Sequence, residues 1–288
     1  MRHFKKGFLL MEVVTACLIL GICLSIMVPI QRFLVHSQSN QQNHLAKFQK
    51  RRILETQFDA QWRRIGKFGC SGLSRSIVIG SESNFPLSNK ASLFGSDWLS
   101  GEDVGQCVAE FHGESHRLIG EFSDCAVGNR TQYRLDVCSG SSLVNMMPDN
   151  TGRFSIALPV SLTEASGLIA TSELSVWYLA KSRSGLNGLW KKSDANRVAQ
   201  ELEAGIAYIA FYPLLDTNGD GHANLITREY GVFSTDQLIA VWVEYIYLFG
   251  HCAGSAPHID YRSFRSKNWS YQPSCEALGG YLLPVGVT

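Results

Sequence analysis

The sequence lacks an excess of charge of either sign. Lysine and arginine together number 26, aspartate and glutamate 25, and the formal net charge is +1. Three of the positive charges, Arg2, Lys5 and Lys6, lie within the first seven residues, so the rest of the chain is slightly acidic. Proteins that bind nucleic acid usually present a basic surface to the phosphates. We therefore predict no nucleic acid partner.

The sequence also lacks the short motifs of common enzymes. It contains no Cys-x-x-Cys, which argues against a thiol redox site or a zinc ribbon. It has no Gly-x-Ser-x-Gly, no P-loop and no dinucleotide-binding fingerprint. These absences give no support to hydrolase or nucleotide chemistry, and we predict that the protein is not an enzyme.

Charge is almost missing from residues 8–30, whose only strongly polar member is Glu12. A helix needs roughly 20 apolar residues to cross a bilayer. The apolar core of a secretory signal peptide is shorter, about 7 to 15 residues. Basic residues precede the run and no comparable cluster follows it, which places the N-terminus in the cytoplasm. The pattern predicts a single-pass membrane protein whose remainder lies on the far side of the membrane; in a Gram-negative host this is an inner-membrane protein with a periplasmic head.

Glycine and proline are both missing between residues 31 and 65, so the helix should continue beyond the membrane. Pro29 should kink this helix without ending it. Apolar residues then recur at steps of three and four, which predicts one stripe packed on a downstream part of the chain. The stripe comprises Leu45, Phe48, Leu54, Phe58, Trp62 and Ile65.

From residue 70 onward, short β-prone runs alternate with clusters of Gly, Ser, Asn and Asp. Residues 175–192 should form a hairpin that turns within 182–188. The fold class is therefore α+β, with a long N-terminal helix packed on a β-rich head. The expected organisation is a leader (1–7), a membrane helix (8–30), its amphipathic continuation (31–69) and a head (70–288). Within the head we expect a loop-rich insertion (70–150), a sheet (151–249) and a loop-rich, disulfide-stapled flap (250–288).

Cysteines fall into two groups. Cys17 and Cys23 lie in the apolar run, and six others follow it, where an oxidising compartment favours disulfides. Six cysteines allow 15 connectivities, of which near-neighbour pairing is our working choice. It joins Cys70 to Cys107, Cys125 to Cys138, and Cys252 to Cys275.

A loop at residues 216–227 has the spacing of a calcium site. Asp216, Asn218 and Asp220 alternate, Gly221 follows for a sharp turn, and His222 offers a carbonyl. Asn224 stands at the ninth place, but the twelfth place holds Thr227 instead of a carboxylate. The same residue types also favour a tight turn without any metal. Calcium and a plain turn both stay open, and no other cofactor is predicted.

The first residues form a recognisable signal. Gly7 precedes Phe8, Glu12 is the fifth residue counted from Phe8, and Pro29 is the twenty-second. This pattern resembles the class III signal of type IV prepilins and pseudopilins. The resemblance implies that prepilin peptidase cleaves between Gly7 and Phe8 and methylates the new amine. Glu12 would then neutralise the amine of a neighbouring subunit and set the axial register, because opposite charges attract strongly in apolar surroundings.

A second resemblance covers residues 174–249. The order "GLNGLWKK", "ELEAGIAYIAFYPLLDTNGDGHAN" and "QLIAVWVEYIYLFG" is similar to the C-terminal domain of PilW-type minor pilins, relatives of the J-type pseudopilins. It implies a minor pilin in the initiating or tip complex of a type IV pilus. Its partners would be other minor and major pilins, prepilin peptidase and the assembly platform protein. The alternatives are a J-type pseudopilin of type II secretion, or a single-pass membrane enzyme or binding protein.

Overall fold

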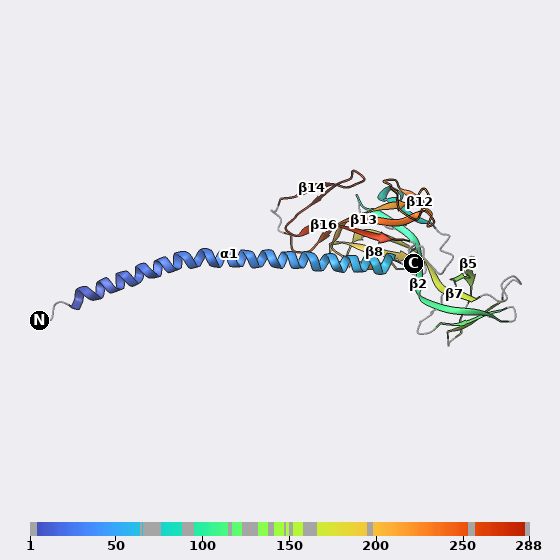
Figure 1. Cartoon of the computed structure of the whole chain (residues 1–288), viewed down its shortest axis with the longest axis horizontal. Helices are drawn as coiled ribbons and strands as arrows, with labels where there is room; N and C mark the ends of the chain where they lie inside the picture. The colour runs from blue at the N-terminus through green and yellow to red at the C-terminus, as the bar shows by residue number, and fades with distance from the viewer. Residues whose placement is uncertain are drawn as a thin grey trace. The chain divides into compact units, whose positions relative to one another are not determined.

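The chain divides into two compact units, Met1–Gln49 and Lys50–Thr288. A computed structural model gives their architecture (Figure 1). It describes residues 5–63, 65, 76–87, 95–114, 117–122, 132–137, 141–146, 148–149, 152–157, 166–194, 198–252 and 257–285.

Helix α1 runs from Lys5 to Trp62 and continues through Pro29. It supplies the described part of the first unit and the opening segment of the second. The helix ends at Trp62, whereas the predicted stripe continues to Ile65, three residues further on. One long N-terminal helix and a β-rich remainder confirm the expected α+β class.

The second unit is otherwise built from strands. In chain order these are β1 (Ile77–Ser81), β2 (Asp97–Glu114), β3 (Arg117–Glu121), β4 (Gln132–Asp136), β5 (Ser141–Asn145), β6 (Arg153–Ala157), β7 (Ser166–Lys181), β8 (Asn187–Ser193), β9 (Gln200–Ala204), β10 (Ile206–Leu215), β11 (Leu225–Ile226), β12 (Gly231–Phe233), β13 (Leu238–Leu248), β14 (Ile259–Arg262), β15 (Asn268–Tyr271) and β16 (Glu276–Pro284). A short 3₁₀ turn, η1 (Glu82–Asn84), follows β1.

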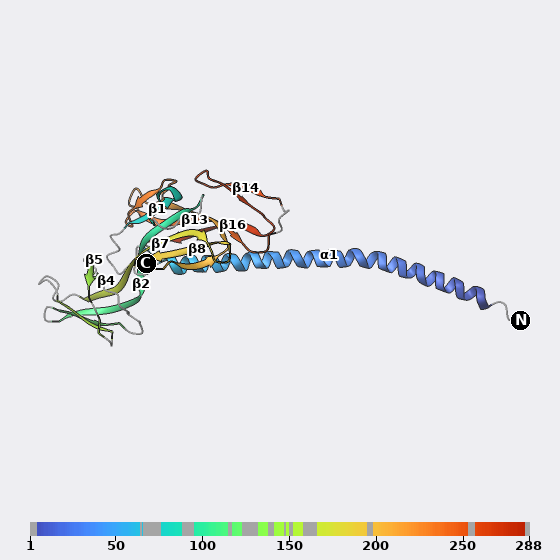
Figure 2. The same cartoon turned by 180° about the vertical axis from the view of Figure 1, so that it is seen from behind.

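Two long strands organise the larger sheet, which has ten strands within the described residues. β2 and β7 pair antiparallel from Leu99↔Trp177 to His112↔Ser166, and the ribbon they form is visible in Figures 1 and 2. The register shifts between Val104 and Val108, where β2 carries extra residues; such a bulge bends a strand. On one side of the shift the ribbon pairs with β1 and β8, and on the other with β3 and β4.

The shift in register separates two hydrophobic clusters. The larger one includes Leu54, Phe58 and Trp62 of α1 together with side chains from both large sheets. The smaller one gathers the far ends of β2 and β7 with β3, β4 and β6, around residues such as Phe111 and Tyr133. The second unit therefore has a main core that includes the end of α1 and a separate distal core.

The smaller sheet has the order β11-β10-β13-β16. β16 pairs with β13 along its whole length, from Ala240↔Pro284 to Leu248↔Glu276. β14 and β15 form a hairpin of their own. The prediction of a loop-rich flap over 250–288 is therefore wrong. The sequence of β16 does not show the alternation of apolar and polar residues that is typical of a strand, because Gly279 and Gly280 interrupt it. These two positions are glycine because the rings of Tyr245 and Trp242 lie against them and leave no room for a side chain.

The predicted hairpin at residues 175–192 is confirmed. β7 and β8 pair from Ser175↔Ser193 to Lys181↔Asn187. The turn closes with the N–H of Ser182 donating to the carbonyl of Leu186 at 2.7 Å. Gly185 has φ of +84° there, a backbone conformation that glycine adopts without steric cost.

The apolar stripe of α1 is shorter than predicted. Leu54, Phe58 and Trp62 are fully buried and Ile65 nearly so, whereas Leu45 is 61% and Phe48 67% exposed. The reason is rotation, because successive helical residues turn by about 100°. The nine residues from Leu45 to Leu54 therefore turn the helix by about half a revolution, onto the opposite face.

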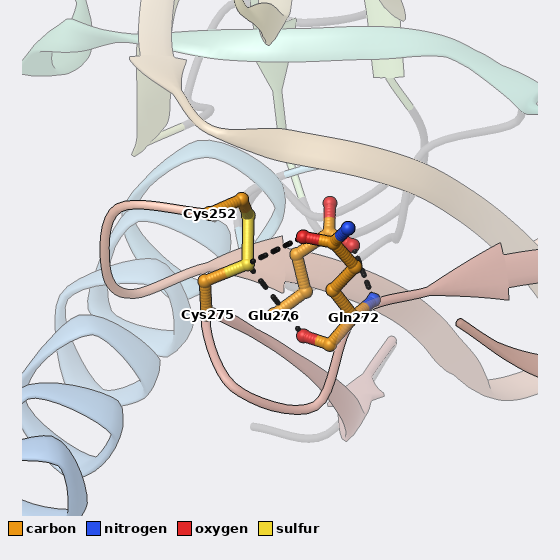
Figure 3. Close-up of a disulfide and its surroundings, with 4 residues drawn as sticks. All are labelled: Cys252, Gln272, Cys275 and Glu276. Atoms are coloured by element: carbon orange, nitrogen blue, oxygen red, sulfur yellow. Dashed lines mark hydrogen bonds between the residues drawn. A yellow bond between two sulfur atoms is a disulfide. The ribbon is translucent and has the colours of Figure 1, made fainter. Parts of the chain in front are cut away.

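One predicted disulfide is confirmed. Cys252 and Cys275 are joined with their Cα atoms 5.1 Å apart, next to Gln272 and Glu276 (Figure 3). The N–H of Gln272 donates to the Glu276 carboxylate at 2.8 Å, which closes the turn that carries Cys275. Cys70, Cys125, Cys138 and the side chain of Cys107 lie outside the described residues, so the other two pairings stay predictions.

Candidate functional site

The first unit presents a long apolar surface. Every side chain from residue 11 to residue 35 is exposed, and most of them are large and apolar. Within the described part of the chain, one helix is long and apolar enough to cross a membrane, and it contains this stretch. Its surface suits contact with lipid or with other apolar helices.

Hydroxyl groups in this stretch are satisfied by their own helix. Thr15 donates to the carbonyls of Met11 at 2.9 Å and Glu12 at 3.0 Å. Ser25 donates to the carbonyl of Ile22 at 2.8 Å. An apolar environment offers these hydroxyl groups no hydrogen-bond partners. Their hydrogen bonds to backbone carbonyls of the same helix make such partners unnecessary.

Glu12 is different, because its carboxylate has no hydrogen-bond or ion-pair partner among the described residues. A carboxylate within a membrane span costs about 2.5–3.5 kcal/mol on insertion scales. A cationic group from another molecule would offset that cost. Gly7 and Phe8 both lie within α1, and the Phe8 side chain is outside the described part of the chain.

Contacts between α1 and the strands of the second unit include those of Lys50. Its ammonium group pairs with the Glu203 carboxylate and donates to the carbonyl of Ala204 at 3.1 Å. Further on, the Tyr281 hydroxyl donates to Asp59 at 3.1 Å, and Phe58 meets Tyr245 edge to face. The end of α1 is thus an internal element of the head.

The loop after β10 forms a closed network around Asp216. The buried Asp216 carboxylate accepts backbone N–H groups from Asn218 at 3.1 Å, Gly219 at 2.6 Å and Gly221 at 2.7 Å. Asp220 accepts from the His222 N–H at 2.8 Å and from the Asn218 amide at 2.9 Å. This arrangement is a stable turn as it stands.

Electrostatics in the loop favour an ionised Asp216. Burial alone would raise the pKa of its carboxyl, but the N–H groups of Gly221, Gly219 and Asn218 outweigh burial and lower that pKa. Asn218, Asp220, His222 and Asn224 are exposed, and the Asn224 side chain accepts the Thr217 N–H at 3.1 Å. No group of three or more His, Cys, Asp or Glu side chains suited to a metal occurs among the described residues. Calcium at this loop stays a prediction.

A buried charge cluster escaped prediction from sequence. Asp97, at the start of β2, pairs with Arg265 and lies 3.2 Å from the Lys267 ammonium. It also accepts the Tyr230 hydroxyl at 2.8 Å and the Phe211 N–H at 3.0 Å. These groups come from four separate parts of the chain, and no local pattern marks their meeting.

Arg265 is the centre of this cluster. Its guanidinium lies 4.1 Å from the Tyr230 ring centre and 4.8 Å from that of Tyr212, and it donates to the Phe211 carbonyl at 2.7 Å. Burial tends to lower the pKa of Lys267, but Asp97 and Tyr230 outweigh burial and raise it. With every charge paired, the cluster ties the β14–β15 hairpin to the base of β2.

Comparisons with known proteins add no relative. No family model, no curated protein and no solved structure matches the chain.

Proposed function

We propose that the protein is a minor pilin, a low-copy subunit of a type IV pilus that takes part in pilus initiation or in the tip complex. The observation that carries the proposal is Glu12, a carboxylate without a described partner in an exposed apolar helix, at the spacing from Gly7 and Phe8 that is typical of prepilins. Prepilin peptidase would cleave after Gly7 and leave a positive amine on Phe8.

Helix α1 suits the two environments that such a subunit occupies. Its apolar residues 11–35 fit a bilayer before assembly and a bundle of like helices afterwards. In the bundle, the Glu12 carboxylate of one subunit would meet the Phe8 amine of a neighbour. Each charge alone is costly in apolar surroundings and the pair is much less so, which favours one axial register.

The head supports the proposal by the way it holds its helix. Lys50, Phe58 and Trp62 join the end of α1 to both sheets. A pull on the helix during extraction from the inner membrane would therefore be transmitted to a periplasmic head. The assembly platform protein and the other pilins would be its partners.

Mass spectrometry of the protein isolated from its host tests this proposal. We expect a mature N-terminus at methylated Phe8 and the presence of the protein in sheared pili. An uncleaved Met1 in a host with active prepilin peptidase would refute the proposal. Cleavage at Phe8 without any incorporation into pili would instead assign the protein to the pseudopilins of a secretion system.

A further inference from the structure

Strand β16 forms one edge of the smaller sheet, and only one of its two sides is paired among the described residues. Its partner β13 lies along that side over the whole strand, and no described strand lies along the other. An edge strand presents a row of unpaired N–H and C=O groups, which natural proteins usually protect from other chains. The outer side of β16 is therefore a candidate surface for contact with another chain.

Hydrogen bonds at the two ends of the β13–β16 ladder show which backbone groups of β16 point outward. At one end the Phe249 N–H donates to the Cys275 carbonyl at 2.8 Å, and at the other the Val285 N–H donates to the Ile239 carbonyl at 2.8 Å. Bonded and unbonded pairs alternate along an antiparallel ladder. The odd-numbered residues of β16 therefore bond to β13, and the backbone groups of its even-numbered residues point away from β13.

Three of these outward residues, Leu278, Gly280 and Leu282, occupy the middle of the strand. Their N–H groups have no hydrogen-bond partner among the described residues. The Gly280 carbonyl accepts from the Arg51 guanidinium at 3.5 Å, which is long for a hydrogen bond. Leu282 is 50% exposed, so this part of the edge is accessible from outside.

The edge of β16 lacks the features that usually protect an open strand, which are short length, bulges, charged side chains and proline. Residues 277–283 contain no charged residue and no proline, and their pairing with β13 shows no shift in register. By contrast, the edge strands β11 and β12 have only two and three residues. The edge strand β9 carries Glu201 and Glu203. Of these four edges, β16 alone is both long and uncharged in its middle.

The spacing of the outward groups determines what can bind them. Alternate residues of a strand lie about 6.8 Å apart, and each offers one N–H and one C=O on the same side. Another extended backbone presents complementary groups at the same spacing. A helix does not, because its N–H and C=O groups bond to one another. The partner of this edge is therefore a strand.

Side chains beside the edge restrict the sequence of that strand. Leu278 and Leu282 lie on one face of β16, and Trp242 of β13 is directly opposite Leu282. Arg51, the charged side chain that reaches the edge, already pairs with Glu55. A charged residue of the partner would lose water here without gaining a counter-charge, which is costly. The partner segment is therefore uncharged over the few residues that pair.

We propose that the outer edge of β16 binds an extended, uncharged segment of another protein, which adds to the smaller sheet as a fifth strand. The inference goes beyond the minor-pilin proposal and does not depend on it, because the edge is open whether or not the chain is cleaved after Gly7. Backbone hydrogen bonds to Leu278, Gly280 and Leu282 would hold the segment, and the two leucines would select its side chains.

Hydrogen exchange at single-residue resolution tests the open edge in the purified full-length protein in detergent. We expect the outward amides of Leu278, Gly280 and Leu282 to exchange at least tenfold faster than those of Tyr281 and Leu283, which bond to β13. Equal protection of the two sets would overturn the inference, because the edge would then be closed within the chain.

Photo-crosslinking in host membranes tests the partner. A benzophenone amino acid replaces the exposed Pro284 at the end of the edge, and a matched variant carries it at Leu186, which is exposed in the β7–β8 turn. We expect position 284 to give adducts with one uncharged segment of another protein, and position 186 to give none with that segment. Adducts with a second copy of this chain, adducts scattered over many proteins, or no adducts at position 284 would overturn the inference.

Two substitutions at Leu282 separate its backbone from its side chain. Leu282→Pro removes an N–H that points away from β13, and edge strands tolerate such a proline. Leu282→Ala keeps the N–H. With benzophenone at position 284, Leu282→Pro should reduce the adduct about tenfold, as expected for one lost hydrogen bond, and Leu282→Ala should reduce it less. Equal adducts from the two variants would contradict the inference.

Thermal unfolding in detergent shows whether Leu282→Pro still folds. If it does not, Leu282→Lys takes its place, because a lysine on an edge strand is a common protection against pairing and leaves the backbone intact. This variant should unfold like the wild type and also give about tenfold less adduct. An undiminished adduct from a folded Leu282→Lys variant would overturn the inference.

Discussion

Two stretches of the same helix use apolar residues in opposite ways. In residues 11–35 they cover all sides of α1 and are exposed. In residues 50–62 three of them, Leu54, Phe58 and Trp62, form a stripe that is fully buried in the head, although Ile53 is exposed. The first stretch leaves its apolar surface exposed, and the second buries its apolar stripe within the chain.

This difference shows that hydrophobicity alone does not tell whether a residue is buried in the core of its own chain. The residues of the second stretch contribute to the folding free energy of this chain, because folding removes them from water. The exposed side chains of the first stretch bury little surface within the chain and contribute little to that free energy; under the proposed function they act in insertion or assembly. Substitutions in the two stretches should therefore change different measurements.

The largest effect is expected for Phe58→Ala. Phe58 is fully buried, stacked on Trp62 and in edge contact with Tyr245. Its removal leaves a cavity, which for a buried Phe costs about 3–5 kcal/mol of unfolding free energy. Denaturant unfolding of the full chain in detergent, followed by tryptophan fluorescence, measures this loss. Phe33→Ala is the control, since Phe33 is 73% exposed; an equal loss in both variants would remove the distinction between the stretches.

A smaller effect, on assembly alone, is expected for Glu12→Ala. Cleavage after Gly7 should continue, whereas entry into pili should fall by about tenfold or more, because the neighbour's amine loses its counter-charge. Unfolding of the head should not change. Glu55→Ala is the matched control, since this acid pairs with Arg51 on the helix surface, where such pairs contribute little. Normal pili with Glu12→Ala as the sole copy would refute the role of Glu12 in register.

The smallest effect concerns the loop at Asp216, which belongs to neither stretch. If the loop binds calcium, a concentration ten times the dissociation constant stabilises the head by about 1.4 kcal/mol. That corresponds to a rise of roughly 3–6 °C in melting temperature. Asp220→Ala should abolish the rise, and Asp236→Ala, an exposed acid outside the loop, should keep it. Melting curves that are identical with calcium and with chelator would identify a plain turn.

Local patterns in the sequence were sufficient for several elements. The long helix follows from the absence of glycine and proline between residues 31 and 65, and the β7–β8 hairpin from the turn residues around Gly185. The Cys252–Cys275 disulfide agrees with pairing of near neighbours. Each of these features depends on interactions between residues that are close in the chain.

Other features depend on distant residues or on helix rotation. Asp97 and Arg265 are 168 residues apart, and nothing near either one indicates the other. Strand β16 was not predicted because Gly279 and Gly280 interrupt the alternation of apolar and polar side chains along it. Only glycine fits at these positions, since the rings of Tyr245 and Trp242 lie against them. The prediction put Leu45 on the same face as Leu54, but a helix has 3.6 residues per turn, so apolar residues spaced by three drift around it from one turn to the next.

The position of β16 has a consequence for biogenesis. If the head is exported to the periplasm in chain order, from residue 70 onward, the sheet β11-β10-β13-β16 stays incomplete until residue 284 has crossed the membrane. Until then the edge of β13 is open, and an open edge strand pairs readily with other chains. Cys275 is the next cysteine in the chain after Cys252, so oxidation in order of emergence already gives the native bond. In that order of export, the closing strand β16 and the disulfide beside it would be completed together.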